Sequence, residues 1–548
     1  MKHRQIPQEL PLLLLVQLAP FGLGLFYEAW CALSALVLLG WLFRQDRRGL
    51  RLRLSPGVIA SAALLLGLLG GGLWGVDRGA ALPGTVKFLP AALFALCCTA
   101  LDDTQRERLL APLPFTAAGM VLLSVLLGQI PALRGFFYYG DSRLTGFFQY
   151  PNSFAAYLLL AAALAAGRER LRRIDAVCLA VLCGGIVLTG SRAVAALLLL
   201  TLTALCLLAR ERKKRLALAV LLLAAAGLGL FLVVRKAGTE SMFARLSGDS
   251  SLLGRLLFWR DALPVVLRHP LGLGYLGYRF RLGSFQTGAY AVMHAHNALL
   301  ELLLDAGWVP AGLFVWAIAR GLRRAGRERR VAITALLAHS LFDFDMQFVA
   351  LLLFLLLLIE GGEGKAAALR PKRLTPWLVL PALLCLWIGA AAALSSLGAP
   401  QAAAALYPGC SQAQLLLLAG ADSAEAMDAA ADRLLTHNEA AALAWSAKAR
   451  AAFSRGDFAA VIACKRRALA LAKYDLAEYL DYADMLRIGE ELYAAAGDTY
   501  SAAVCREEYR SIPALLDAVL DKTSPLAWKL ETPPELTLPP DYAWLLEQ

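Results

Sequence analysis

Charged residues are scarce in this chain. Asp, Glu, Lys and Arg together make up 18% of its 548 residues, whereas 59% of the residues are hydrophobic. The mean hydropathy is correspondingly high, at +0.58. This composition excludes an ordinary soluble globular protein, because such a protein cannot bury so much apolar surface, and it indicates a polytopic membrane protein.

Cysteine is present without any informative pattern. Seven of the ten cysteines lie in apolar stretches, where cysteine behaves as a small apolar residue. The other three are Cys410, Cys464 and Cys505, an odd number without metal-ligand spacing. The sequence therefore predicts no disulfide framework, no zinc site and no catalytic cysteine.

Acidic residues are also fewer than basic ones, 42 against 54, which gives a formal net charge of +12. The basic residues occur in short clusters between apolar stretches, which is the pattern that sets membrane orientation and not the pattern of a nucleic-acid-binding surface. We therefore expect lipid partners, no nucleic acid, and a cytoplasmic location for the N terminus and for the clustered loops. These clusters are Arg44–Arg53, Arg168–Arg173, Arg210–Arg215, Arg320–Arg330 and Lys365–Arg373.

The apolar stretches predict about 12 to 13 membrane spans, although several are shorter than the roughly 20 residues that a spanning helix needs. No small-residue cleavage site follows the first stretch, so we expect it to be a retained signal anchor. The predicted spans are residues 10–26, 29–43, 57–76, 82–101, 109–128, 152–167, 174–190, 192–209, 216–234, 295–319, 331–343, 347–360 and 375–397.

The predicted fold is all-α, with two parts. Residues 1–397 form a polytopic transmembrane helix bundle, whose long outer loops are residues 129–151 and 235–294. Residues 398–548 are alanine-rich and charged, and we expect a soluble α-helical, repeat-like domain there. An odd number of preceding spans would place that domain on the outer side of the membrane.

Part of this C-terminal region resembles a tetratricopeptide unit. Gly456-Asp457-Phe458 is followed by Ala468, and Trp445 and Tyr479 lie on either side. Small residues at such positions let two helices pack closely. The alternative is an unrelated alanine-rich helical bundle. A protein partner would bind through the repeats of this region.

The most informative polar residues lie where the loop of residues 235–294 meets the next apolar stretch. His294, His296 and Asn297 precede Glu301 and Asp305. Asn297, Glu301 and Asp305 recur every four residues, so on a helix they form one polar stripe. Polar groups inside a membrane are costly, and this stripe therefore predicts a membrane-embedded reaction or transport site.

Arginines on the predicted outer side favour an anionic substrate. Arg192 lies in the turn Thr189–Arg192, and the loop of residues 235–294 adds others, among them Arg255 and Arg279. A guanidinium binds two phosphate oxygens at once and keeps its charge. For Arg192 the alternative is a side chain that merely reaches the membrane interface.

Two further polar pairs are candidates. Arg143 and Asn152 flank the start of one apolar stretch, where Asn152 also fits a simple helix cap. His339 and Asp343 are four residues apart, so on one helix they would share a face and bond each other. That pair suits a structural clamp as well as a catalytic role.

Together these motifs resemble the O-antigen ligase and O-antigen polymerase superfamily over most of residues 50–360. The C-terminal repeat-like region is similar to one branch of that superfamily. Pro310 departs from the glycine, threonine or tyrosine that ligases tend to carry at this place. The motifs that carry the resemblance are Arg143-x-x-Gly146 leading to Pro151-Asn152, the Ser191-Arg192 turn, and His296-Asn297-x9-Gly307.

The resemblance implies a GT-C-like, inverting glycosyltransferase that needs no metal or other cofactor. Its donor would be a glycan on a polyprenyl pyrophosphate, and its acceptor a hydroxyl of a glycan, lipid or protein, at the outer face of the bacterial cytoplasmic (inner) membrane. His296 would be the catalytic histidine, with Arg192 and Arg143 holding the pyrophosphate. Substrate-binding residues would be His294, Asn297, Glu301, Arg279, Arg255, Asn152, His339 and Asp343.

The chemistry of such a transfer agrees with these residue types. A departing pyrophosphate needs stabilisation of its negative charge, which arginines provide. The acceptor hydroxyl must lose a proton, and neutral histidine is a suitable base near neutral pH. His296 begins the helix and is the better candidate, with His294 as a supporting donor.

Other functions remain open from the sequence. A transporter or flippase of lipid-linked glycans would use the arginines but would need no base. A protein-directed O-oligosaccharyltransferase would use the same donor chemistry with a protein acceptor. A scaffold would use only the C-terminal repeats. Polymerase and ligase differ only in what carries the acceptor hydroxyl, so the donor-side motifs do not separate them.

Overall fold

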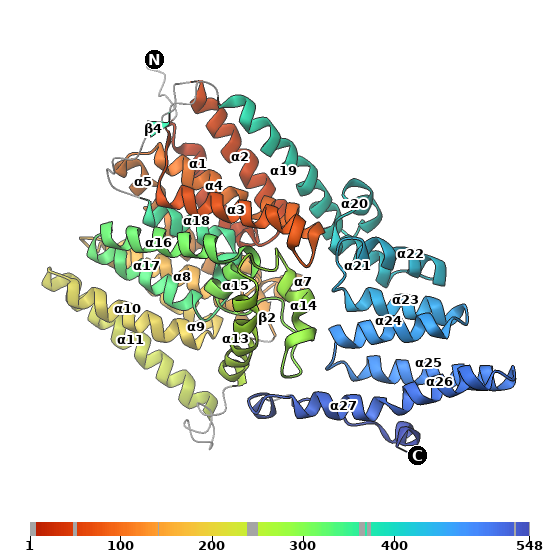
Figure 1. Cartoon of the computed structure of the whole chain (residues 1–548). Coiled ribbons are helices and arrows are strands. Elements are labelled where there is room, and N and C mark those ends of the chain that lie inside the picture. Colours follow the sequence, from red (N-terminus) through yellow and green to blue (C-terminus); the bar gives the residue numbers. More distant parts are fainter. Residues whose placement is uncertain are drawn as a thin grey trace.

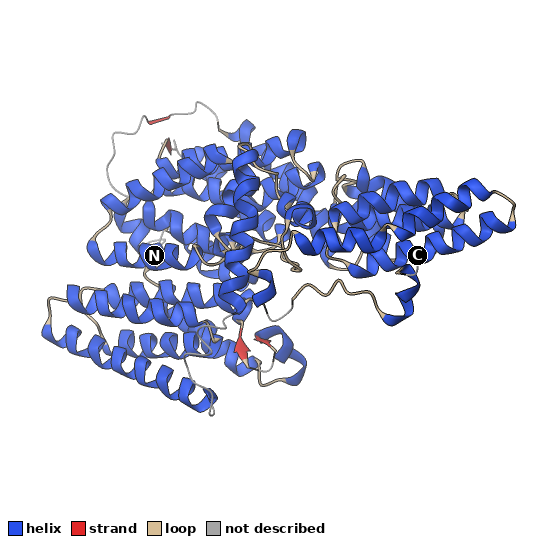
Figure 2. Cartoon of the chain, turned by 60° about the horizontal axis from the view of Figure 1, so that its bottom comes forward, coloured by secondary structure: helices blue, strands red, loops and turns tan. Residues whose placement is uncertain are grey.

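Helices carry nearly all of the regular structure in the computed structural model (Figures 1 and 2). Only two small antiparallel sheets occur among the described residues. β1 (Leu52–Arg53) pairs with β4 (Ala368–Leu369), and β2 (Tyr138–Tyr139) pairs with β3 (Arg143–Leu144). The predicted all-α class is confirmed. The structure describes residues 7–47, 52–140, 142–237, 250–360, 368–369, 374–530 and 533–546.

The helices of residues 10–396 form one bundle (Figure 1). They are α1 (Leu10–Leu18), α2 (Glu28–Asp46), α3 (Pro56–Trp74), α4 (Ala81–Thr99), α5 (Asp103–Leu110), α6 (Leu113–Leu127), α7 (Pro131–Phe137), α8 (Pro151–Gly167), α9 (Arg173–Thr189), α10 (Arg192–Leu208), α11 (Arg212–Ala237), α13 (Ser250–Arg268), α14 (Gly277–Phe285), α15 (Ala298–Ala306), α16 (Trp308–Arg324), α17 (Arg327–Ser340), α18 (Val349–Ile359) and α19 (Thr375–Ser396).

Helices α8 and α18 lie at the centre of the bundle. Every residue of α18 is buried, and so are most residues of α8. Both helices are apolar on all sides, which is the pattern of a helix surrounded by other helices or lipid. Helix α8 packs against α9, α17, α10 and α6, so the core is built from segments far apart in the sequence.

Four helical segments among the described residues are long and apolar enough to cross a membrane. These are Pro56–Trp74, Arg78–Thr99, Asp103–Leu127 and Thr375–Ser396, judged by length and composition. Shorter apolar helices, including Pro151–Gly167 and Arg192–Leu208, lie at other predicted spans. The structure therefore supports a membrane protein, while the expected 12 to 13 spans stay a prediction.

Residues 295–319, expected as one span, do not form one continuous helix. Helix α15 ends at Ala306 and α16 begins at Trp308, with Gly307 between them at φ +87°. A side chain at Gly307 would meet the backbone of Pro270 and Leu271. The chain breaks here because only glycine tolerates both this conformation and this close approach.

The C-terminal region is a row of antiparallel helices, drawn in blue in Figure 1. Gly456 at φ +72° and Gly497 at φ +78° turn two of these hairpins, and residues of 452–545 share their own hydrophobic cluster. The helices are α20 (Pro400–Leu406), α21 (Ser411–Ala419), α22 (Ala424–Leu435), α23 (Ala442–Ser454), α24 (Phe458–Leu471), α25 (Leu476–Ala495), α26 (Thr499–Arg510) and α27 (Ile512–Asp521).

These C-terminal helices contact the loop that holds α13 and α14. Backbone amide Ser524 donates to the Thr287 carbonyl oxygen at 2.8 Å, and Arg260 donates to the Ser524 hydroxyl. Gly283 of α14 packs directly against the carbonyl group of Leu471. The C-terminal region thus also contacts α14 and the segment after it, in addition to its covalent connection through α19.

A second contact joins the α3–α4 turn to the C-terminal helices. Asp77 is 1% exposed, and it accepts a hydrogen bond from Ser411 Oγ at 2.6 Å. Ser411 Oγ lies 3.2 Å from His437 Nε2, and the Arg78 amide donates to the His437 carbonyl oxygen at 2.9 Å. Burial raises the pKa of the Asp77 carboxyl to about 6.

This raised pKa predicts a pH-dependent contact. Between about pH 4 and 6 the folded protein holds a proton on Asp77 that the unfolded chain has released, so the stability contributed by this group falls as pH rises through that window. The variant Asp77→Asn stays neutral. We expect it to exceed wild type in unfolding free energy by about 2 kcal/mol at pH 7.5, with the difference vanishing near pH 4.

Thermal unfolding of wild type and Asp77→Asn across this pH range measures the difference. Asp517→Asn, at an exposed position on α27, is the matched control and should show little pH-dependent difference. A constant difference for Asp77→Asn at every pH would contradict the assignment.

Candidate active site

His296 is held in an unusual backbone conformation at the start of α15. Its φ is +52°, which is uncommon outside glycine. The next residue, Asn297, caps the helix by accepting from the amides of Leu299 and Leu300 at 3.0 Å each. Asn297 Nδ2 also donates to the Leu341 carbonyl oxygen at 2.9 Å. The cap fixes the chain on both sides of the imidazole, and such strain concentrates at functional sites.

Asp343 is the centre of a buried polar cluster and is 0% exposed. Tyr150 Oη donates to both carboxylate oxygens at 3.1 Å, and Asn152 Nδ2 donates at 2.9 Å. Arg255 forms an ion pair with the carboxylate at 3.3 Å. His296 Nδ1 lies 3.1 Å from Asp343 Oδ1. Three parts of the chain that are distant in sequence thus converge on one carboxylate.

This contact determines which nitrogen of His296 is available for chemistry. A carboxylate only accepts hydrogen bonds, so Nδ1 carries the proton and donates it to Asp343. In the neutral form of this imidazole, Nε2 has the free lone pair. The imidazole remains partly accessible, with 20% of its side chain exposed, although Asp343 is not. A neutral histidine with an oriented, accessible Nε2 is the arrangement of a general base.

The expected bond between His339 and Asp343 is wrong. Helix α17 ends at Ser340, so Asp343 does not share a helical face with His339. His339 Nδ1 instead lies 2.6 Å from Asp345 Oδ2, and Asp345 also accepts from Ser153 Oγ at 2.8 Å. His339 is 2% exposed. This second pair joins α17 to α8 inside the bundle.

His294 is far more buried than His296. It is 4% exposed and stacks on the Phe344 ring with centroids 4.6 Å apart. Its Nδ1 lies 3.1 Å from Glu301 Oε2, and Glu301 also accepts from the Ala295 amide. Burial, together with the positive charge of Lys87, lowers the pKa of His294 to about 3. His294 and Glu301 therefore brace the loop that presents His296.

Arg143 lies beside this cluster, within electrostatic reach of both Arg192 and Arg255. Arg143 donates from Nε to the Thr189 carbonyl oxygen at 3.0 Å and from one terminal nitrogen to Asn152 Oδ1 at 2.8 Å. Burial lowers the pKa of Arg143, and the charges of Arg192 and Arg255 lower it as well. Mutual repulsion of this kind favours a bound anion.

The structure does not bring Arg279 into this cluster. Arg279 lies on α14, and its guanidinium sits over the Phe280 ring at 5.8 Å. Helix α14 packs against α24 of the C-terminal region. Among the described residues, no hydrogen bond or ion pair joins Arg279 to His296 or Asp343. Its expected role in substrate binding stays a prediction.

Lys87 and two of its partners, Tyr275 and Gln347, are not among the residues predicted from the sequence. Lys87 is 1% exposed inside α4, and its Nζ donates to Tyr275 Oη at 3.2 Å and to Gln347 Oε1 at 3.0 Å. Gln347 Nε2 continues to Asp305 Oδ2 at 3.1 Å, and Tyr275 Oη donates to Glu28 at 2.8 Å. A lysine within an apolar stretch was the available signal, because such a charge needs buried partners.

An apolar cavity of about 400 Å³ opens next to the histidines. Phe344, whose ring lies 5.0 Å from that of His296, forms part of its wall. Glu301, Asp305, Ser340 and Gln347 contribute its few polar groups. The remaining wall is mostly leucine, phenylalanine and other apolar side chains from α15, α16, α17 and α18.

A comparison with known protein families matches a segment that contains part of the candidate site. Residues 177–317 match the family model described as O-Antigen ligase. The matched segment contains Arg192, Arg255 and His296 but ends before Asp343. A search of curated proteins finds no match. The family match supports the O-antigen ligase superfamily and a role in glycan transfer during polysaccharide biosynthesis.

The contacts of Asp343 predict a large effect on stability when its carboxylate is removed. Asp343→Ala leaves Tyr150, Asn152 and Arg255 without their acceptor inside the bundle. We expect it to lower the free energy of unfolding by about 3–5 kcal/mol. Thermal unfolding in detergent measures the loss. Asp517→Ala, at an exposed position, is the control, and equal shifts for the two variants would contradict the central position of Asp343.

Proposed function

We propose that this protein transfers a glycan from a polyprenyl-pyrophosphate carrier to an acceptor hydroxyl at the outer face of the bacterial cytoplasmic membrane. The observation that supports the proposal most strongly is the His296–Asp343 pair, 3.1 Å apart, beside the cluster of Arg143, Arg192 and Arg255. A base next to an anion-binding cluster is what a single displacement of pyrophosphate requires.

In the proposed reaction, His296 Nε2 takes the proton of the acceptor hydroxyl. The resulting oxygen attacks the anomeric carbon of the donor sugar, and the bond from that carbon to the pyrophosphate oxygen breaks. A single displacement inverts the configuration at this carbon. Asp343 stabilises the imidazolium that forms, because its carboxylate accepts from Nδ1.

The pyrophosphate leaves with additional negative charge, and the three guanidiniums would bind it. Arg143 is held in place by Thr189 and Asn152, so it is already oriented before donor binding. Oriented donors stabilise developing charge without the cost of reorganisation. We propose that these arginines serve the function that a metal ion serves in other pyrophosphate-releasing transferases.

The apolar cavity beside Phe344 provides a place for the polyprenyl chain. Its wall is almost wholly apolar, and among its few polar groups Glu301 contacts His294. A ligand with an anionic head and a long hydrocarbon tail fits this combination of surfaces. Transport of the same lipid would use the same surfaces but would not need the oriented Nε2 of His296.

We further propose that the C-terminal helices take part in acceptor selection, since they contact the loop that leads to His296. The same proposal includes three further points. These helices form tetratricopeptide-like repeats, they bind a protein partner, and they lie on the outer side of the membrane. The acceptor is a glycan for a polymerase, a lipid for a ligase, or a protein for an oligosaccharyltransferase, and trials with each acceptor distinguish these subclasses.

The two histidines provide a matched test of the base. His296→Ala should lower kcat by about 100- to 10,000-fold in glycan transfer from a synthetic polyprenyl-pyrophosphate donor, because the general base is lost. Donor binding should persist. His294→Ala should lower thermal stability and retain much more of kcat, since His294 does not meet the acceptor. Equal kcat for wild type and His296→Ala would overturn the assignment of the base. No product from wild type with any acceptor, with lipid moved across vesicles by both proteins, would favour the transporter.

The arginine cluster predicts donor binding without a metal. Activity should be unchanged by EDTA, and Arg192→Gln should weaken donor binding by about 10- to 100-fold through loss of a charge-assisted contact. Arg268→Gln removes the same charge from an exposed position at the end of α13 and should leave donor affinity nearly unchanged. Loss of activity on chelation, restored by a divalent cation, would overturn this part of the proposal.

A further inference from the structure

A second cavity, which is polar, lies at the end of the central helices α8 and α18 that is opposite to His296. Its volume is about 520 Å³, and its wall includes Gly167, where α8 ends, and Ile359, where α18 ends. The His296 cluster meets the other end of α8, at Asn152. Helix α8 has 17 residues, which corresponds to a separation of about 25 Å. The two sites are therefore distinct.

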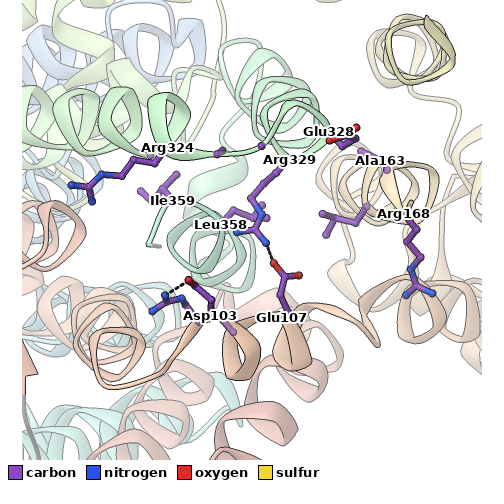
Figure 3. A pocket seen from close by; sticks show the side chains of 15 residues that line it. Asp103, Glu107, Ala163, Arg168, Arg324, Glu328, Arg329, Leu358 and Ile359 are labelled. Carbon is purple, nitrogen blue, oxygen red and sulfur yellow. Dashed lines mark hydrogen bonds and ion pairs between the residues drawn. The ribbon is translucent and has the colours of Figure 1, made fainter. Parts of the chain in front are cut away.

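The cavity combines guanidinium groups with an apolar floor (Figure 3). The side chains of Leu358 and Ile359 lie between the polar groups in this view. Four arginines and three acidic residues belong to the wall, so its formal charge is positive. These residues are Arg106, Arg168, Arg324, Arg329, Asp103, Glu107 and Glu328.

Two of the four arginines are used in structural contacts. Arg106 donates to the carbonyl oxygens of Cys98 and Leu101 at 3.1 and 2.7 Å and pairs with Asp103. Arg168 pairs with the buried carboxylate of Asp175 at 2.5 Å. These contacts hold the ends of α4, α8 and α9 together, and they leave those guanidiniums little freedom for a ligand.

The other two arginines are available. Arg324 has no hydrogen bond or ion pair with any residue that the structure describes, and it is exposed at the end of α16. Arg329, on the first turn of α17, pairs only with Glu107 in the described part of the chain. The Glu107 side chain is 61% exposed, so it can turn toward solvent and release Arg329. Figure 3 shows both guanidiniums at the cavity.

We propose that this cavity binds the phosphoryl headgroup of an anionic membrane lipid. Arg324 and Arg329 would bind the phosphate oxygens, since planar guanidiniums form paired, charge-assisted hydrogen bonds to phosphate. The acyl chains would lie over Leu358 and Ile359. Basic pockets between helix ends, with apolar walls below, are the sites where anionic lipid headgroups bind in membrane proteins.

A neighbouring cavity supports a ligand with a hydrocarbon chain. Its volume is about 450 Å³, and it shares Glu107, Leu164, Arg168 and Arg329 with the first cavity. Its further wall includes the ring of Phe115. The phosphate site thus continues along an apolar surface, which a soluble phosphate would leave empty but a lipid chain would cover.

The test compares lipid retention by two double variants of the full-length protein. Wild type, Arg324→Gln/Arg329→Gln and the control Arg323→Gln/Arg327→Gln are placed in nanodiscs of equal phosphatidylglycerol and phosphatidylcholine, and retained lipids are counted by native mass spectrometry. Arg323 and Arg327 lie in the same connection and are exposed, but they do not line the cavity.

We expect the cavity variant to lose at least fivefold in retained phosphatidylglycerol relative to the control variant, with phosphatidylcholine unchanged. The single variant Arg324→Gln, which disturbs no ion pair of the described residues, should show a smaller loss in the same direction and should fold normally. Equal losses of phosphatidylglycerol in the two double variants would mean that general surface charge causes the loss, and this result would overturn the proposed lipid site. No loss in either would also overturn it.

Inorganic phosphate distinguishes a lipid from a soluble ligand. At millimolar concentration it should leave phosphatidylglycerol retention by wild type unchanged, because the lipid gains affinity from its chains as well as from its headgroup. Displacement of the lipid by inorganic phosphate would show that the cavity takes a soluble phosphate, and it would overturn the lipid assignment.

Discussion

The buried carboxylate of Asp343 is the interaction on which the candidate site depends. A carboxylate inside a helix bundle is stable only when its oxygens are satisfied, and here a tyrosine, an asparagine, an arginine and a histidine do so. These partners come from the start of α8, from α13 and from the loop before α15. Because this one charge must be paired, the chain places His296, the proposed base, and Arg255 beside the same carboxylate.

The central helices α8 and α18 make this arrangement rigid, and their two ends differ in chemistry. Helices α8 and α18 are buried along their lengths and carry different chemistry at their two ends. One end meets the His296 cluster and the adjoining apolar cavity, and the other meets the cavity at Arg324 and Arg329. We therefore propose substrate chemistry at one end of this core and lipid binding at the other.

Much of the fold follows from local sequence. The apolar stretches predicted the positions of helices such as α8 and α10 closely. A long apolar stretch that begins at Pro151 or Arg192 is too long for a strand and is therefore predicted as a helix. The break at Gly307 was missed, since it depends on the close approach of Pro270 and Leu271, which belong to a distant part of the chain.

Several residues of the candidate site have a signal in the sequence, but the contacts between them do not. His296, Arg143 and Asp343 each carry a local signal, whereas the pairing of His296 with Asp343 spans 47 positions of sequence. Helical spacing favoured His339 as the partner of Asp343, and the end of α17 at Ser340 removed that possibility. Tertiary packing decided the partner, and periodicity along one helix contains no information about it.

The most direct test of the proposed transfer is a structure of the protein with a polyprenyl pyrophosphate bound. The account predicts pyrophosphate density among Arg143, Arg192 and Arg255, the first prenyl units in the apolar cavity beside Phe344, and an open position for the acceptor at His296 Nε2. Pyrophosphate bound elsewhere, with His296 facing away from it, would contradict the account.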